Sequence, residues 1–201
     1  MKKLLAIICL LPLLAGCSRE NRALSQGIAL REKLLNSPGC SFSCRITADY
    51  GDAIHKFSLA CQADSRGNLR FQVTEPETIA GIAGKIREDG GRLTFGDRAL
   101  HFDLLTDDQL SPVCGPWIFL RTLRGGYLLN GGVEGEKLHL QAQDSYEADA
   151  LHVDLWLLED GTPETCEILY RNRKILTLEI GDFLLSAGQP SEPAGTPEIP
   201  K

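Results

Sequence analysis

Apolar and polar residues alternate in two neighbouring segments of this chain, residues 44–50 and 55–61. An alternation with period 2 is typical of β-strands that bury one face and expose the other. A short segment containing Gly51 and Asp52 separates the two. Together they predict a β-hairpin with one apolar and one polar face.

The position of the turn decides which residues of this hairpin face each other. A turn centred on Asp52 and Ala53 places Cys44 opposite Cys61, with the apolar residues on one face of both strands. The Cβ atoms of opposed residues lie about 4.5–5.5 Å apart, whereas a disulfide needs about 3.5–4.5 Å. We therefore expect Cys44 and Cys61 to be neighbours that a strained disulfide could join in an oxidising compartment.

The same alternation recurs along the rest of the chain and predicts about nine or ten short strands in all. The further strands centre on residues 69–73, 86, 93–95, 100–104, 138–142, 151–157, 166–170 and 176–180. Short turns rich in glycine and aspartate join most of them, which favours consecutive antiparallel hairpins. Hairpins of this kind, each with one apolar face, build a single curved sheet.

Two segments follow a helical pattern instead. Residues 20–36 carry apolar side chains at helical spacing, which predicts an N-terminal amphipathic helix. Residues 116–124 begin with a proline and are followed by two glycines, a combination that favours a short helix.

These elements predict a mainly β (α+β) fold. It is a curved antiparallel sheet, or half-open β-barrel, with an N-terminal helix and a mid-chain helical lid. The apolar face of such a sheet must be covered, and the two helices are the available elements. The apolar side chains of the predicted lid are Trp117, Ile118, Phe119, Leu120 and Leu123.

The beginning of the chain has the form of a targeting signal. Two lysines precede an apolar run, residues 4–14, that is shorter than the ~20 residues needed to span a bilayer. The sequence Leu14-Ala15-Gly16-Cys17 resembles the lipobox of bacterial lipoproteins. The resemblance implies cleavage before Cys17 and a diacylglyceryl group on its sulfur. Two acyl chains anchor a protein stably. The alternative interpretation of this segment is an ordinary secretory signal without lipidation.

These signals divide the chain into four parts. Residues 1–16 are the predicted signal peptide, 17–19 the lipid-anchored N-terminus, and 20–184 one domain. Residues 185–201 contain four prolines and no apolar period, which predicts a disordered tail. The mature protein is therefore expected on the extracytoplasmic face of the cell membrane, held there by its lipid.

The charge of the mature chain argues against a nucleic-acid partner. Removing the two lysines of the signal from the 21 basic residues leaves 19 against 27 acidic ones, a net charge of -8. Phosphate backbones are bound by lysine and arginine, so an acidic protein is a poor match for them. Anionic lipid headgroups offer the chain no attraction either, so membrane residence depends on the lipid.

The cysteines and other reactive residues form no recognisable site. Beyond the signal and Cys17, five cysteines remain: Cys40, Cys44, Cys61, Cys114 and Cys166. Their spacing fits no structural zinc site, and we expect neither a metal nor a cofactor. Cys114 precedes the mid-chain helix and is the one candidate nucleophile, although an idle buried thiol is the favoured interpretation. The pairing of Cys40, Cys114 and Cys166 stays open.

The histidines and acidic pairs add no catalytic motif. The four histidines lack helical ligand spacing such as HExxH, and His139 and His152 are expected on exposed faces. The acidic pairs at 107–108 and 134/136 lie in predicted loops and are interpreted as solvated charge. We therefore expect no enzymatic activity.

The order of elements resembles the LolA/LolB family of lipoprotein carriers, and most of all the germination-type lipoproteins of spore-forming Firmicutes. The residues that carry the resemblance are 71–77, 79–82, 90–95, 155–158, 161–163 and 175–180. It implies a half-open β-barrel with a helical lid over an apolar concavity. In carriers this concavity holds lipoprotein acyl chains, whereas the germination lipoproteins use the fold to partner a cell-wall amidase.

The apolar face of the sheet has two interpretations. It is either an acyl-chain cavity under a movable lid or a solid core that the lid fills, and sequence alone favours the solid core slightly. The residues expected to line a cavity are Phe57, Leu59, Phe71, Val73, Phe95, Val153 and Leu155.

The expected function is that of a membrane-anchored, non-enzymatic binding or scaffold protein for an envelope partner, including regulation of a germination or cell-wall enzyme. The alternative is a carrier or acceptor of lipoproteins or lipids. Stable lipidation favours the fixed role, because a carrier must shuttle.

Overall fold

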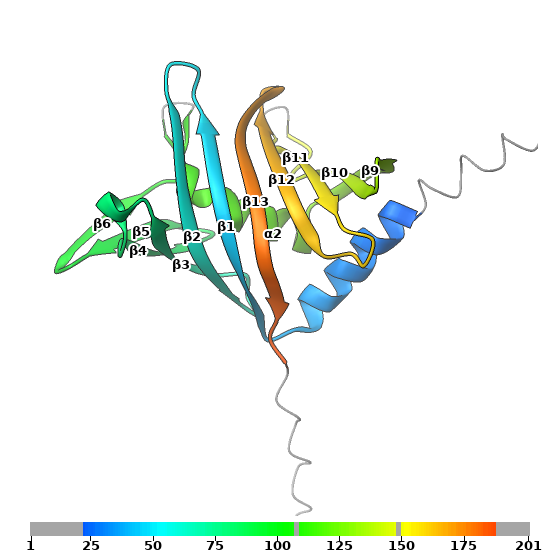
Figure 1. Cartoon of the computed structure of the whole chain (residues 1–201), viewed down its shortest axis with the longest axis horizontal. Helices are drawn as coiled ribbons and strands as arrows, with labels where there is room; N and C mark the ends of the chain where they lie inside the picture. The colour runs from blue at the N-terminus through cyan, green and yellow to red at the C-terminus, as the bar shows by residue number, and fades with distance from the viewer. Residues whose placement is uncertain (1–21, 107–108, 148–149, 188–201) are drawn as a thin grey trace, which may run out of the picture.

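The structure, a computed structural model, describes residues 22–106, 109–147 and 150–187. A helix over residues 22–36 precedes the strands, and the colours of Figure 1 run from blue to red along the chain. The strands of the first half are β1 (Gly39–Asp49), β2 (Ile54–Asp64), β3 (Leu69–Glu75), β4 (Ala83–Arg87), β5 (Gly90–Phe95), β6 (Arg98–Phe102), β7 (Leu105–Thr106) and β8 (Gln109–Leu110). After helix α2 (Gly115–Gly125) come β9 (Tyr127–Glu134), β10 (Lys137–Gln143), β11 (His152–Leu157), β12 (Pro163–Tyr170) and β13 (Arg173–Leu185). Two short 3-10 helices are η1 (Glu77–Ile79) and η2 (Pro112–Cys114).

Eleven of these strands form one curved, open sheet in the order β6-β5-β4-β3-β2-β1-β13-β12-β11-β10-β9. All pairs are antiparallel, and two meanders meet where β1 pairs with β13. Strands β7 and β8 form a separate two-stranded sheet. The predicted fold class is confirmed. The strand that the periodicity missed in the main sheet is β9, where Gly131 and Gly132 interrupt the alternation.

The predicted register of the first hairpin is wrong. Cys44 pairs with Leu59, and Cys61 pairs with Phe42. The turn centres on Gly51 and Asp52, one residue earlier than expected. Gly51 adopts a φ of 93°, which favours glycine, and its N–H donates to the Asp49 carboxylate at 2.8 Å.

This correction leaves every side chain on its predicted face, because each pairing shifts by two residues and strands have period 2. Cys44 and Cys61 are therefore diagonal neighbours on one face. Diagonal positions lie about 7–8 Å apart, beyond the usual Cα separation of a disulfide. The cysteines that the structure describes are all free thiols.

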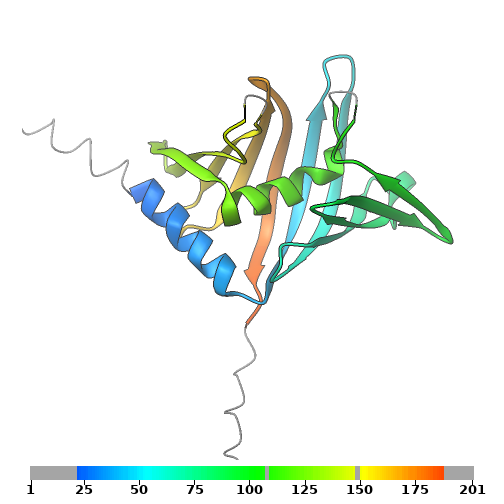
Figure 2. The ribbon, with the colours of Figure 1, turned by 180° about the vertical axis from the view of Figure 1, so that it is seen from behind.

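The two helices cover the same face of the sheet, which we call the inner face; the opposite face is the outer face. Figure 2 shows α2 lying across the middle of the sheet and the N-terminal helix lying obliquely below it. The N-terminal helix packs against β9 and β10: Gly131 approaches Ala23, and Leu140 lies so close to Gly27 that a side chain there would collide with it. The absence of a side chain at Gly27 therefore permits close contact between the N-terminal helix and β10.

Several predictions about the ends of the chain fall outside the described residues. These are the signal peptide 1–16, the lipidated Cys17 and most of the tail. At the other boundary, β13 extends to Leu185, and the backbone N–H of Ser186 still donates to Gly39 at 2.9 Å. Within the part of the chain that is described, no helix has the length and apolar character to cross a membrane.

The start of β1 offers a test of this packing. A Cβ at Gly39 would collide with the backbone oxygen of Ala63 on the paired strand β2. We expect Gly39→Ala to lower the free energy of unfolding by about 1–3 kcal/mol, measured by urea denaturation. The matched control is Gly132→Ala on β9, where a Cβ meets only open space, and where the change should stay within about 0.5 kcal/mol. Equal effects at both positions would contradict the packing.

Candidate functional site

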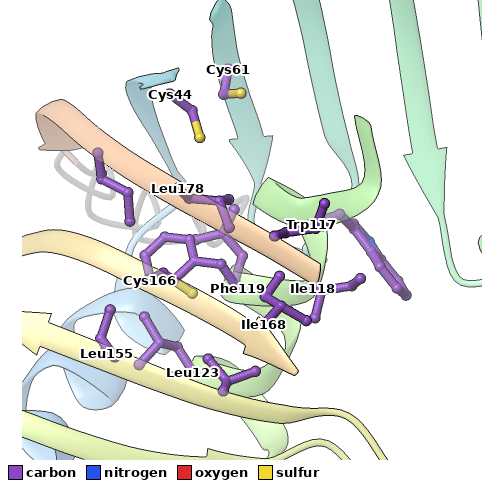
Figure 3. Packing of buried hydrophobic residues seen from close by; sticks show 14 of the residues in the cluster. Cys44, Cys61, Trp117, Ile118, Phe119, Leu123, Leu155, Cys166, Ile168 and Leu178 are labelled. Atoms are coloured by element: carbon purple, nitrogen blue, oxygen red, sulfur yellow. The ribbon is translucent and has the colours of Figure 1, made fainter. Parts of the chain in front are cut away.

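The inner face and α2 are the site that the sequence predicts. Pro116 in the first turn and two glycines at the end set the limits of α2, as expected from the sequence. All five predicted lid residues are buried: Trp117, Ile118, Phe119, Leu120 and Leu123. Figure 3 shows side chains of α2 and of β11, β12 and β13 gathered in one cluster. Trp117 also stacks beneath Arg121, whose guanidinium carbon lies 5.2 Å from the ring centroid.

Six of the seven residues expected to line a cavity are buried on the inner face: Phe57, Leu59, Phe71, Val73, Val153 and Leu155. They share one contiguous core cluster with α2. The buried side chains of α2 therefore belong to the same core as these six residues.

The seventh, Phe95, was wrongly placed in the cavity. It lies at the end of β5, which is next to the edge strand β6 in the strand order, and it is 61% exposed. Leu100 on β6 shares the same face through the pairing of Leu93 with Leu100, and it is 63% exposed. We call strands β3, β4, β5 and β6 the wing. Its two outermost strands, β5 and β6, therefore carry exposed apolar side chains at the inner face.

Two arginines link the helices, because each donates hydrogen bonds to backbone carbonyls near the end of the other helix. We call this pair of contacts the arginine exchange. Sequence analysis missed it. The last carbonyls of any helix lack intrahelical partners. Arg31 of the N-terminal helix donates to the Leu123 carbonyl at the end of α2, and to the carbonyls of Thr122 at 3.3 Å and Gly126 at 2.7 Å. Partial burial lowers the pKa of Arg31.

Arg124 makes the reciprocal contact from α2. Its guanidinium donates to the Leu34 carbonyl at 3.0 Å, in the last turn of the N-terminal helix, and to the Ser65 carbonyl at 2.6 Å in the turn after β2. Cations at helix C-termini also interact favourably with the helix dipole. Only the tertiary arrangement brings these partners together, because Arg31 and its acceptors lie about ninety residues apart in sequence.

The cysteines are buried on this apolar face and are chemically quiet. Burial raises the pKa of Cys40 to about 11, partly offset by the charge of Arg124, and raises that of Cys114 to about 12. Burial likewise raises the pKa of Cys44, Cys61 and Cys166. A nucleophilic thiol needs a lowered pKa. The position of Cys114 before α2 therefore does not activate it.

His139 lies in an unpredicted polar cluster on the outer face, and its side chain is mostly covered. Its Nε2 lies 2.9 Å from an oxygen of Asp154, and its Nδ1 lies 3.6 Å from an oxygen of Glu134. The ring stacks on Trp156, with 4.7 Å between centroids, and the indole N–H donates to Glu134 at 2.8 Å. Both imidazole nitrogens face carboxylates, so the arrangement is that of a structural contact. Among the described side chains, no cluster has the composition and geometry of a metal site.

Comparison with known proteins gives similarities of fold. No protein-family model matches the sequence, and no curated protein matches it significantly. An uncharacterized conserved protein from Thermus thermophilus is 12% identical, with 82% of this chain and 89% of that one covered and a TM-score of 0.45.

Two further solved structures carry names from lipoprotein transport. A LolA superfamily protein from Nitrosomonas europaea is 12% identical over 82% of this chain and 94% of that one, with a TM-score of 0.41. A putative outer membrane lipoprotein-sorting protein domain from Vibrio parahaemolyticus is 9% identical over 82% and 93%, with a TM-score of 0.44. These similarities concern the general path of the chain, and they assign no ligand or residue role. The nearer resemblance to germination lipoproteins stays a prediction.

The buried thiols give a prediction about pH. The folded pKa values of Cys40 and Cys114 lie above the ordinary value of 9.0, so the unfolded chain loses these protons first as the pH rises. Their contribution to stability is complete below pH 9.0 and is lost as the pH rises through about 11 and 12. At pH 8 the native protein should leave a chromogenic disulfide reagent almost unreacted at these positions, and they should react fully in urea. Rapid reaction of either thiol in the native state would contradict their burial.

The arginine exchange gives a second prediction. Arg31→Ala leaves partly buried carbonyls of α2 without their charged donor, and it should lower the free energy of unfolding by about 2–4 kcal/mol in denaturant titrations. Arg22→Ala is the control on the same helix. It removes an exposed ion pair to Glu159 at 3.8 Å, which is worth about 0–1 kcal/mol. If the two variants lose equal stability, the exchange does not fix the helices.

Proposed function

We propose that this chain is a lipid-anchored, non-enzymatic protein of the extracytoplasmic membrane face that binds an envelope partner protein. The observation that carries the proposal is the exposed apolar inner face of the wing, at Phe95 and Leu100. Large apolar side chains that gather on one exposed face are typical of interaction sites. Because this surface lies beyond the part that α2 covers, a partner can reach it without moving the helix.

The packing of α2 supports a fixed binding role over shuttling. Its buried side chains complete the core, so a ligand cavity on the inner face requires α2 to leave. Truncating buried aromatic side chains of this kind costs about 3–5 kcal/mol, which indicates what displacing the helix would forfeit. The predicted anchor at Cys17 also suits a protein that stays on its membrane. Regulation of a germination or cell-wall enzyme is one specific form of this role.

A lipid or lipoprotein carrier is the second candidate, and the arginine exchange favours it. The contacts of Arg31 and Arg124 are polar and reach backbone carbonyls, so they can be broken and remade as a unit. A lipophilic ligand that replaced α2 on the inner face would compensate the lost apolar contacts. This alternative predicts a lipid, and no polypeptide, bound to the purified protein.

Native mass spectrometry of the full chain, extracted from its membrane in mild detergent, distinguishes the two roles. We expect a second polypeptide to be retained, and we expect Phe95→Ser/Leu100→Ser to lose it while keeping the wild-type unfolding midpoint, because both side chains are exposed. Ile54→Ser is the matched control, since Ile54 is 63% exposed in the first hairpin. A co-purified lipid without a polypeptide would favour the carrier. Loss of the polypeptide in the Ile54 variant would contradict the assignment of the surface.

A further inference from the structure

A row of basic residues crosses the outer face of the wing. Arg70 on β3 lies directly opposite Lys85 on β4, and Lys85 lies directly opposite Arg92 on β5. The alternating neighbours Leu69, Phe71 and Ile86 are buried on the inner face, so the row points outward. Neighbouring strands are about 4.8 Å apart, and the three cations therefore span about 10 Å.

The row lines a hollow with a volume of about 720 Å³. Arg87, two residues beyond Lys85 on β4, contributes a fourth cation, and His101 lies at the β6 side. Asp89 and Asp103 also line the hollow, which leaves a surplus of positive charge. The hollow falls within the ~300–1,000 Å³ range of small-molecule sites.

The four cations have no partners among the residues that the structure describes. Throughout residues 22–106, 109–147 and 150–187, no hydrogen bond or ion pair involves the side chains of Arg70, Lys85, Arg87 or Arg92. Some cations elsewhere on the sheet are paired, such as Arg45 with Glu179 at 3.2 Å and Lys174 with Glu167 at 2.8 Å.

Such a row is unfavourable by itself. Like charges directly opposite each other on neighbouring strands destabilise a sheet. Here this happens twice in succession, in a chain whose overall net charge is -6. A multivalent anion in the hollow would turn this repulsion into attraction, because guanidinium and ammonium groups bind oxyanions through charge-assisted hydrogen bonds.

We propose that the outer face of the wing binds an anion with two or more phosphate groups, held by Arg70, Lys85 and Arg92 with Arg87 beside them. One phosphate reaches two neighbouring cations, whereas a chain of phosphates engages the whole row. This site lies on the opposite face from the apolar surface of the proposed function and goes beyond that function.

The position of the hollow favours a phosphate-bearing molecule that is not part of the anchoring membrane. The N-terminal helix, which follows the predicted anchor, packs on β9 and β10 at one edge of the sheet, and its Arg22 pairs with Glu159 after β11. The wing forms the other edge. Figure 1 shows the start of the helix and β6 at opposite sides of the molecule.

Titration of the full chain with inorganic tripolyphosphate, followed by calorimetry in mild detergent, tests the site. We expect saturable binding that is tighter than the binding of orthophosphate. Lys85→Gln/Arg92→Gln removes two charged donors and should weaken binding by at least about tenfold. Lys56→Gln is the control, because Lys56 is an exposed cation on the outer face of β2, outside the hollow; its affinity should match the wild type.

Three results would overturn the proposal. One is tripolyphosphate binding that sodium chloride of equal ionic strength abolishes completely. Another is an equal loss in the Lys56 variant, which would indicate a general charge effect. The third is binding to vesicles rich in phosphatidylglycerol without binding to tripolyphosphate, which would assign the hollow to lipid headgroups.

Thermal unfolding without ligand gives an independent readout. Because the row is repulsive when empty, Lys85→Gln should raise the melting temperature by about 1–3 °C, and tripolyphosphate should raise the melting temperature of the wild type but not of the double variant. A purely structural role for Lys85 predicts the opposite sign. A lower melting temperature for Lys85→Gln would therefore count against the site.

Discussion

The whole fold depends on covering one apolar face of an open sheet. Most strands of the eleven-stranded sheet contribute buried side chains to one core, and such an apolar face is stable in water only when another layer packs on it. Here α2 and the N-terminal helix form that layer, and Arg31 and Arg124 tie each helix to the backbone end of the other. Neither helix can therefore leave the inner face without breaking hydrogen bonds to the other.

Periodicity predicted the strands and their faces because burial on one side of a sheet imposes period 2 on the sequence. It could not fix the pairing, since a shift of two residues leaves the same side chains buried. Gly51 decided the register instead: its left-handed backbone centres the turn one residue earlier than the notional Asp52–Ala53 turn. Strand β9 escaped detection for a related reason. It is an edge strand with little burial, so neither face imposes a hydrophobic pattern on it.

The candidate sites were predictable to different degrees. The lid residues follow from their local apolar density, and all five are buried accordingly: Trp117, Ile118, Phe119, Leu120 and Leu123. Phe95 has the same parity as its buried neighbours, but the helices do not extend over this end of the wing. The sequence pattern does not indicate how much of the sheet the helices cover. The arginine exchange and the basic row depend on contacts between distant segments. Arg70, Lys85 and Arg92 are ordinary polar-face residues until the strand pairing places them side by side.

The two halves of the sheet differ in the ion pairing of their outer faces and in the burial of their inner faces. Around β10 to β13 the outer face carries paired charges, such as Lys137 with Glu164 at 2.6 Å and Lys174 with Glu167, and the inner face lies under the helices. In the wing the outer face carries cations that have no partner within the described part of the chain, and the inner face of β5 and β6 carries exposed apolar groups. Both the exposed apolar side chains and the unneutralised charges lie in the wing, at the opposite side of the molecule from the N-terminal helix. The exposed apolar side chains and the row of neighbouring cations are both unfavourable in the free protein, so stability of the fold alone does not explain them. The wing is better explained as the part of the molecule whose stable state includes something bound to it.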